Sequence, residues 1–162
     1  MQVCKPDPRL KIVSGGQSGV DRAALDVAME VGIPCGGWCP RGRVAEDGRI
    51  PERYPLRETP SAGYAQRTEW NIRDADATLV LHRGPLCGGT ALTVALARRL
   101  GKPSLTVDLA EAADRAAIGS WLDERRVAVL NVAGPRESQA PGICAQAAAV
   151  LRALLAGVSR GA

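Results

Sequence analysis

Short runs of β-branched and aliphatic residues alternate along the chain with longer stretches whose apolar residues recur at helical spacing. In the stretch from 21 to 31, Leu25, Ala28, Met29 and Val31 fall roughly on one face of a helix. The same reasoning predicts strands at 10–14, 77–81, 103–107 and 127–132, and a further extended piece beginning at Ile33. It predicts helices at 21–31, 64–75, 90–100, 111–126 and 143–155.

Strands that alternate with helices of roughly ten to fifteen residues are typical of βαβ units with a parallel sheet. Because such crossovers are right-handed, the turns from each strand to the next helix lie along one edge of the sheet. We therefore predict the α/β class, with a doubly wound, mainly parallel sheet of about five strands or more between two helical layers. The length of 162 residues and the lack of a linker favour a single domain over residues 1–162.

Residues 35–63 interrupt this alternation. They are rich in glycine and proline, a composition typical of a loop rather than a helix or a strand. Loops of this length in compact domains are usually either functional or disordered. Apolar and aromatic side chains within the segment favour an ordered loop: Trp38, Ile50, Tyr54 and Leu56.

Composition narrows the function classes. The net charge is +4, from 21 Lys and Arg against 17 Asp and Glu, and the basic residues are scattered, so nucleic-acid binding is not favoured. No apolar stretch approaches the roughly 18 residues of a membrane span, so we expect no membrane association. An odd number of cysteines, five, and an N-terminus unlike a signal peptide indicate reduced thiols in the cytoplasm.

The first turn with candidate chemistry follows the first predicted strand. Glycines allow positive φ and a close approach of the backbone to a ligand, and a helix start favours phosphate or carboxylate. The turn lacks the three spaced glycines of a dinucleotide site and the lysine of a P-loop. The alternative is a tight connection in which Ser18 or Asp21 caps the helix. The candidate ligand-binding residues here are Gly15, Gly16, Gln17, Ser18, Gly19, Asp21 and Arg22.

Two further turns lie at the same predicted edge. Gly88, Gly89 and Thr90 precede a helix, and two helix starts of this kind can hold one anion between them. After the last strand, the candidates are Asn131, Gly134, Arg136 and Ser138, of which the arginine can bind an anionic group through two hydrogen bonds. The alternative for this third turn is a solvated loop with an ordinary ion pair.

Other constellations carry less weight. Cys35 and Cys39 have no second pair at zinc-site spacing, and His82 is the single histidine of the chain, so we expect no metal site. The same histidine ends a strand with no nucleophile elbow near any serine, which argues against a Ser-His-Asp triad. Acidic residues are predicted near the sheet edge, but their spacing does not identify a catalytic pair.

Several segments resemble the family of molybdenum carrier proteins. The matching strings are GGQSGVDRAALD (15–26), GGWCPRG (36–42), AEDGRIP (45–51), RTEWN (67–71), GGT (88–90) and LNVAGPRESQAPG (130–142). The resemblance runs from about residue 11 to 155. It implies a three-layer Rossmann-like domain related to LOG and DprA-type folds, which binds the molybdenum cofactor, a phosphorylated pterin, or a nucleotide. It also implies a homo-oligomer, a dimer or tetramer, and a role for Trp38 in the wall against the ligand.

The resemblance extends to LOG phosphoribohydrolases, which have an arginine before the central strand and a Gly-Gly-x-Gly-Thr-x-x-Glu turn after it. Arg67 matches the arginine, whereas Thr93 stands where those enzymes have a catalytic glutamate. Because a hydroxyl cannot stabilise a cationic ribosyl centre as a carboxylate does, we expect a carrier rather than an enzyme. A nucleotide-processing hydrolase that uses Glu69 or Glu137 is the alternative, and a module that binds single-stranded DNA is a more remote one.

Overall fold

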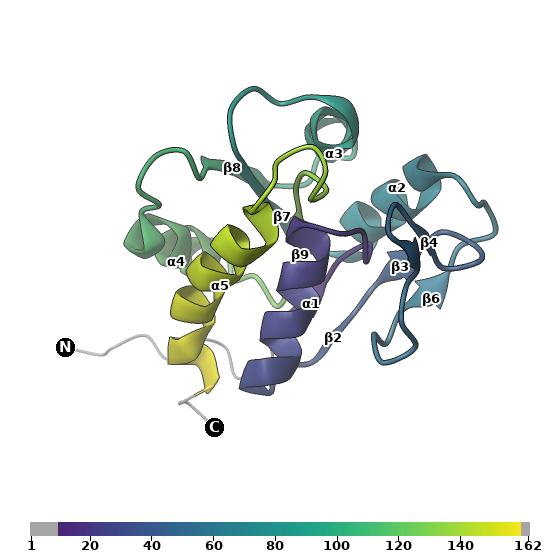
Figure 1. Ribbon diagram of the computed structural model, residues 1–162. Coiled ribbons are helices and arrows are strands. Elements are labelled where there is room, and N and C mark those ends of the chain that lie inside the picture. Colours follow the sequence, from purple (N-terminus) through teal and green to yellow (C-terminus); the bar gives the residue numbers. More distant parts are fainter. Residues whose placement is uncertain (1–9, 160–162) are drawn as a thin grey trace.

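The computed structural model describes residues 10–159. Its centre is a five-stranded sheet in which all pairs of neighbouring strands are parallel, and helices lie on both sides of it (Figure 1). The strands of this sheet are β1 (Lys11–Val13), β2 (Cys35–Gly36), β7 (Ala77–His82), β8 (Ser104–Asp108) and β9 (Val129–Ala133). Their order is β2-β1-β9-β7-β8, so the last strand of the chain lies between the first strand and β7. The carboxyl ends of β1, β9 and β7 consequently lie side by side.

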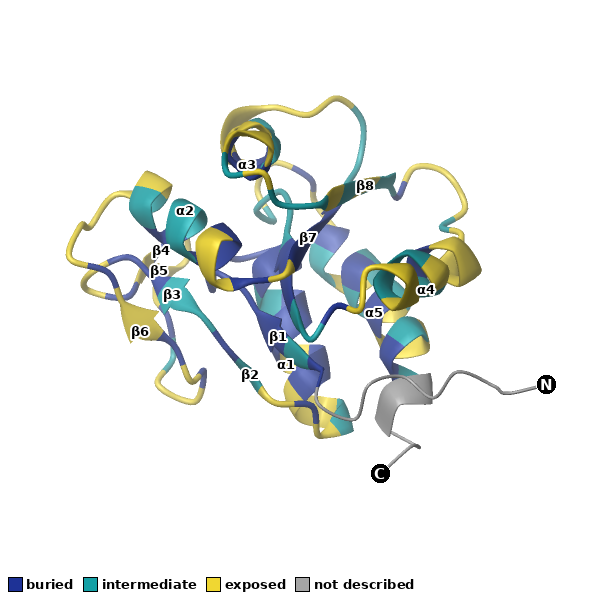
Figure 2. Cartoon of the chain, turned by 180° about the vertical axis from the view of Figure 1, so that it is seen from behind, coloured by how far each residue is buried: buried dark blue, intermediate teal, exposed yellow. Residues whose placement is uncertain are grey.

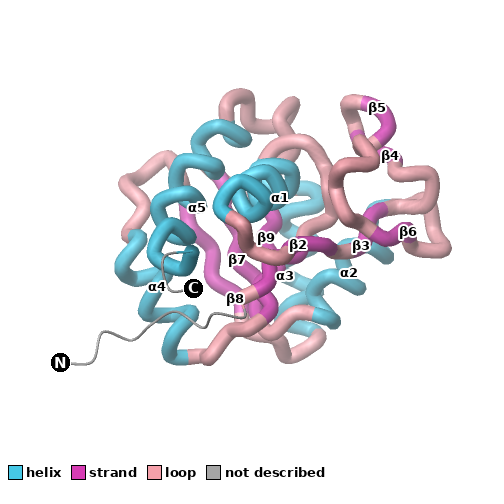
Figure 3. Tube along the Cα trace, turned by 90° about the horizontal axis from the view of Figure 1, so that it is seen from below, coloured by secondary structure: helices cyan, strands magenta, loops and turns pink. Residues whose placement is uncertain are grey.

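Five helices cover the two faces of the sheet (Figure 3). Helices α1 (Val20–Val31), α4 (Arg115–Glu124) and α5 (Ile143–Ser159) pack together on one face. Helices α2 (Tyr64–Asp74) and α3 (Gly88–Arg99) pack together on the other. The predicted class, a three-layer α/β fold with a parallel sheet, is confirmed. The predicted extent over residues 1–162 stays a prediction, because residues 1–9 and 160–162 lie outside the described residues.

The two faces of the sheet differ in chemistry. The main hydrophobic core lies under α1, α4 and α5 and includes Ile12, Leu79, Leu130 and Leu151, all fully buried. The apolar cluster under α2 and α3 is much smaller, and buried polar residues accompany it on these elements: Arg67, Asn71, Thr90, Thr93 and, on the strands, Thr78 and Asn131. Figure 2 shows the buried residues on the central strands and on the inner sides of the helices.

Residues 35–63 are ordered, as predicted, but they also contain short strands that their composition did not predict. The first, β2, joins the edge of the central sheet. The others form two small pairs, β3 (Trp38–Cys39) with β6 (Arg57–Glu58), and β4 (Val44–Ala45) with β5 (Gly48–Arg49). A buried arginine, Arg43, holds the segment together by donating hydrogen bonds to four of its carbonyl oxygens, those of Ile50, Pro51, Tyr54 and Leu56.

Predicted helix boundaries differ from the observed ones by up to four residues: the helix predicted over 111–126 ends at Glu124, and the one predicted to end at 155 ends at Ser159. Two helix starts also differ. The helix predicted from residue 111 begins at Arg115, because the side chain of Asp114 caps it by accepting a 3.0 Å hydrogen bond from the amide of Ala117. The helix predicted from Thr90 begins at Gly88, which adopts a positive φ of 53° that glycine accommodates easily.

Candidate ligand-binding site

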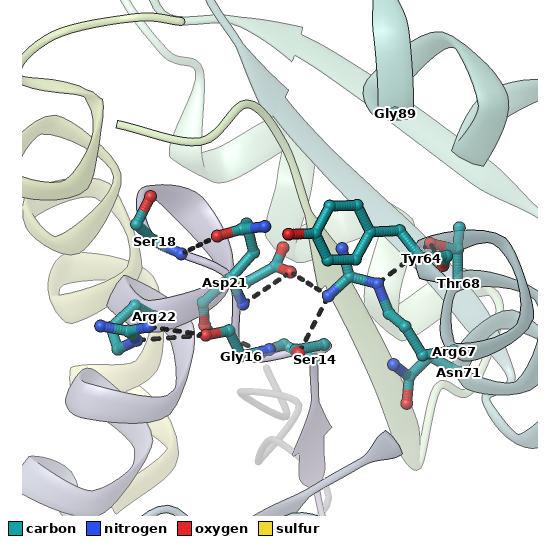
Figure 4. Close-up of polar contacts among 12 residues, drawn as sticks. Ser14, Gly16, Ser18, Asp21, Arg22, Tyr64, Arg67, Thr68, Asn71 and Gly89 are labelled. Atoms are coloured by element: carbon teal, nitrogen blue, oxygen red, sulfur yellow. Dashed lines mark hydrogen bonds and ion pairs between the residues drawn. The ribbon is translucent and has the colours of Figure 1, made fainter. Parts of the chain in front are cut away.

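A pocket of about 80 Å³ opens at the carboxyl ends of β1 and β9. Its walls come from the turn before α1, the first turns of α2, the start of α3 and the loop after β9 (Figure 4). The lining residues that the sequence predicted are Gly15, Gln17, Asp21, Gly89, Thr90, Asn131, Gly134 and Arg136. The structure therefore brings all three predicted turns together at one pocket.

Glycines in the first and third turns let the two turns pack against each other. Gly19 has a φ of 83°, and a Cβ atom there would collide with the carbonyl oxygen of Pro135. A Cβ atom at Gly134 would collide with the carbonyl oxygen of Leu81 and with the side chain of Val20. These glycines are thus required by the close contact between the turns, which is a different reason from the approach of a ligand that the sequence suggested.

Backbone amides of the first turn already have partners within the protein. The amide of Gln17 donates to Oδ2 of Asp21 at 3.3 Å, and the amide of Ser18 donates to Oε1 of Gln17 at 3.0 Å. The amide of Val20 donates to the carbonyl oxygen of Pro135. The carboxylate of Asp21 therefore occupies the amide of Gln17, and three amides of this helix start, those of Gln17, Ser18 and Val20, are not available to an anion.

Asp21 is paired with Arg67 from α2. Their Oδ2 and Nη1 atoms are 3.6 Å apart, and Arg67 also donates a 3.0 Å hydrogen bond to the carbonyl oxygen of Gly15 (Figure 4). Only 7% of the surface of Asp21 is exposed. Burial raises the pKa of Asp21 to about 6, although Arg67 and the amide of Gln17 partly oppose this shift. The pocket thus contains a carboxyl group that titrates close to neutral pH.

Two guanidinium groups flank the aromatic ring of Tyr64, the first residue of α2. The Cζ atom of Arg67 lies 5.1 Å from the ring centroid, and that of Arg136 lies 5.9 Å from it. All three residues line the pocket. With Asp21 as the single carboxylate among the described lining residues, the pocket has an excess of positive charge and an aromatic wall.

The start of α3 provides the free donors that the first turn lacks. Within residues 10–159, the amides of Gly88, Gly89 and Thr90 donate to no acceptor, and no side chain caps this helix. Thr90 is only 4% exposed, lines the pocket, and has no hydrogen-bond partner for its hydroxyl among those residues. Such a helix start can bind an anion, because its N–H groups donate hydrogen bonds and the positive end of the helix dipole attracts negative charge.

Glu46, in the turn between β4 and β5, ties the first and third turns together. Its carboxylate accepts hydrogen bonds from the hydroxyls of Ser18 and Ser138 and, at 3.1 Å, from the amide of Ser138. Its Oε2 atom lies 4.0 Å from Nε of Arg136. These hydrogen bonds and the nearby arginine hold the pKa of Glu46 below its usual value, although desolvation raises it. Glu46 therefore helps to hold Arg136 at the pocket.

Several predicted residues lie outside the pocket. Ser18, Gly19, Arg22 and Ser138 line a second, shallower hollow on the other side of the first turn, where Arg22 pairs with Asp47 at 2.7 Å. Gly16 and Gly88 line neither. Trp38 packs edge to face against Trp70, with ring centroids 4.8 Å apart, and donates a 2.8 Å hydrogen bond from Nε1 to Asp74, so it is not part of the pocket wall.

The resemblance to LOG enzymes singled out Arg67 and Thr93, but the sequence did not predict that other residues of α2 line the site. Tyr64, Arg67, Thr68 and Asn71 all line the pocket, together with Leu92, Thr93 and Gln139 from α3 and the third turn. The RTEWN string contained three of the α2 residues, but no spacing argument placed that helix over the first turn. One usable signal was the need of a buried Asp21 for a cationic partner.

Comparisons with known proteins agree with this architecture. The model of the circularly permutated YpsA SLOG family matches residues 12–155. A crystal structure from Syntrophus aciditrophicus SB, named "Putative molybdenum carrier protein", superposes with a TM-score of 0.88 at 46% sequence identity. The alignment covers 91% of this chain and 96% of that one. None of the curated proteins matches the chain.

Proposed function

Because the chain belongs to the circularly permutated YpsA SLOG family, we propose that it is a carrier that binds a small phosphorylated ligand in the pocket. The ligand proposed is the molybdenum cofactor, a pterin that bears a phosphate group. The observation that carries this proposal is the 46% identity, over 91% of the chain, to a protein named as a molybdenum carrier. Conservation of the fold alone would not suffice, because one fold supports many functions.

The phosphate end of such a ligand fits the start of α3. The unpaired amides of Gly89 and Thr90 and the unpaired hydroxyl of Thr90, all at the pocket, are the donors a phosphate requires. Arg136, in the same pocket, adds a positive charge and a planar set of donors. The pocket is partly open and is lined by the start of α3 as well as by the first turn, so a ligand larger than a phosphate can reach from one to the other.

The arrangement of carboxylates supports holding rather than cleaving. Glu69, one of the two residues considered as a catalytic substitute, is paired with Arg99 at 3.4 Å and lies outside the pocket. The other, Glu137, accepts hydrogen bonds from the amides of Gly142 and Cys144 and also lies outside it. Thr93 does line the pocket, but its hydroxyl donates to the carbonyl oxygen of Gly89 within α3.

One observation keeps hydrolysis of a nucleotide as a second candidate function. Asp21 lies in the pocket with a pKa of about 6, which suits a general acid or base near neutral pH. Incubation of the protein with a panel of nucleoside monophosphates tests this candidate. Release of free base or phosphate that Asp21→Asn abolishes would support the hydrolase, and intact nucleotides with every member of the panel would exclude it.

Native mass spectrometry of the protein purified from cells that make the cofactor tests the carrier. The expected result is a retained pterin whose oxidation in air is slower than that of the free cofactor. Two matched variants serve as a control, Arg136→Gln in the pocket and Arg99→Gln outside it. Their comparison separates retention of the pterin by the pocket from a general effect of lost positive charge. Absence of any retained pterin, and no protection from oxidation, would contradict the proposal.

Other properties are part of the same proposal. No helix within residues 10–159 has the length and apolar character to cross a membrane, and we propose that the protein acts in the cytoplasm as a homo-oligomer, a dimer or tetramer. Within the described chain, no three histidine, cysteine or acidic side chains gather in a way that could hold a metal ion. In this proposal the pterin holds the molybdenum. Nucleic-acid binding is not part of the proposal.

A further inference from the structure

One side of the pocket carries a donor and an acceptor that the protein leaves available to a ligand. The side-chain carbonyl of Gln17 accepts hydrogen bonds from the amides of Ser18, at 3.0 Å, and Glu46, at 2.9 Å. These two bonds fix which end of the side-chain amide is the oxygen. The Nε2 atom is thus left as a donor, and among the described residues it has no acceptor, although only 5% of Gln17 is exposed.

The acceptor is the carboxylate of Asp21, four residues further along the same turn. It accepts a 3.3 Å hydrogen bond from the amide of Gln17, which places the two residues side by side. The guanidinium of Arg67 lies 3.6 Å away and donates to the carbonyl oxygen of Gly15. Because a carboxylate has about four acceptor positions, Asp21 retains the capacity to accept hydrogen bonds from a ligand.

Figure 4 shows Asp21 apart from Gly89 at the start of α3, which lines the same pocket. A ligand phosphate is repelled by Asp21 and attracted by α3 and Arg136, so the ligand must enter with its anionic end toward α3. What it presents to the first turn must be hydrogen-bond donors for Asp21 and an acceptor for Nε2 of Gln17. A ligand group without hydrogen-bond donors would bury the carboxylate of Asp21 unpaired, which opposes binding of that group.

We propose that Gln17 and Asp21 recognise the 2-amino-4-oxopyrimidine edge that pterins share with guanine. On this edge an exocyclic amino group and a ring N–H lie side by side as donors, next to a carbonyl oxygen that accepts. The amino group and the ring N–H donate to Asp21, and Nε2 of Gln17 donates to the carbonyl oxygen. Adenine presents an unprotonated ring nitrogen where this pattern requires a donor. This inference rests on the proposed function and names the chemical class of the ring.

Calorimetric titration of the purified protein with GMP, IMP and AMP tests the inference. IMP lacks only the amino group, so its Kd is expected to be about 10-fold higher than that of GMP, from the value of a hydrogen bond to a charged group. The Kd of AMP is expected to be roughly 100-fold higher or more, because it leaves both the carboxylate and Nε2 unpaired. Equal affinities for the three nucleotides would overturn the inference and would indicate that the first turn contacts the ribose instead.

A matched pair of variants assigns the discrimination to Asp21. Asp21→Asn keeps the shape of the side chain but replaces one acceptor with a donor, so the preference for GMP over IMP is expected to fall to about one. Asp47→Asn, the same change at a carboxylate outside the pocket, is expected to leave the preference unchanged. Loss of the preference in both variants, or in neither, would contradict the assignment. If Asp21→Asn does not fold, the ranking of the three nucleotides by the unmodified protein still decides.

The titration also separates this inference from the proposed function. Binding of all three nucleotides without preference overturns only the recognition by Gln17 and Asp21. Failure of all three to bind overturns the recognition too, and native mass spectrometry then decides whether a pterin is nevertheless carried. If no nucleotide binds and no pterin is retained, both the recognition by Gln17 and Asp21 and the proposed function are refuted.

Discussion

Asp21→Asn should change the pH dependence of stability in a direction that the buried carboxyl group determines. Burial raises the pKa of Asp21 from 3.8 to about 6 in the folded protein, so between these two values the folded state binds more protons than the unfolded state. The contribution of Asp21 to stability is thus fully present below a pH of about 4 and is lost as the pH rises through 6. Asparagine does not titrate, so the variant lacks this contribution at every pH.

The size of the effect follows from the shift. A rise of about two pKa units corresponds to roughly 3 kcal/mol, at 1.36 kcal/mol per unit. The free energy of unfolding of the wild-type protein, relative to that of Asp21→Asn, is expected to fall by up to this amount between about pH 4 and pH 7. The comparison within a pair cancels the titration of all other groups, provided both proteins unfold in a two-state transition.

Urea denaturation of both proteins at half-unit pH steps measures this difference. A suitable control is Asp47→Asn, because its hydrogen bond with Arg22 lowers the pKa of Asp47. When the wild type is compared with Asp47→Asn, the change in stability with pH has the opposite sign. The wild type gains stability relative to Asp47→Asn as the pH rises through the titration of the Asp47 carboxyl group. Parallel stability profiles for wild type and Asp21→Asn, or a relative gain of the wild type with rising pH, would refute the conclusion that burial raises the pKa of Asp21 despite Arg67.

Three further changes probe the turns. Gly19→Ala should destabilise the protein by about 2 kcal/mol or more, measured by urea denaturation, because φ is 83° and the new Cβ atom collides with the carbonyl oxygen of Pro135; a loss under 0.5 kcal/mol would contradict this. Glu46→Gln should weaken binding of phosphorylated ligands by about 3- to 10-fold in calorimetry, because the charge that holds Arg136 is lost; unchanged affinity would exclude the positioning role. Thr90→Val should raise the Kd of GMP by about 10-fold and leave that of guanosine unchanged, and an equal effect on both would place the phosphate elsewhere.

The sequence predicted most elements of the fold because their apolar periodicity is strong, as in α1 and β7. It did not predict the order of the strands. Strand β9 is inserted between β1 and β7, a long-range pairing that local patterns do not encode. Strand β2 is only two residues long, Cys35–Gly36, and merges in composition with the loop that follows.

At the site, the sequence predicted which turns meet but not which of them offers free donors. The glycines before α1 and those at the start of α3 were both interpreted as signs of a helix start that binds an anion. In the first, Asp21 folds back onto the amide of Gln17, whereas in the second Cys87 leaves the helix start uncapped. The position of Tyr64 and Arg67 depends on the ordered segment 35–63, which brings α2 over the first turn and has no periodic pattern from which its path could be predicted.

A crystal structure of the protein with a bound phosphorylated pterin or GMP would test the central claim most directly. The account predicts the phosphate oxygens within hydrogen-bond distance of the amides of Gly89 and Thr90, with Arg136 beside them and the ring toward Asp21. A phosphate bound instead to the amides of residues 16–18, with Asp21 displaced from the turn, would contradict it.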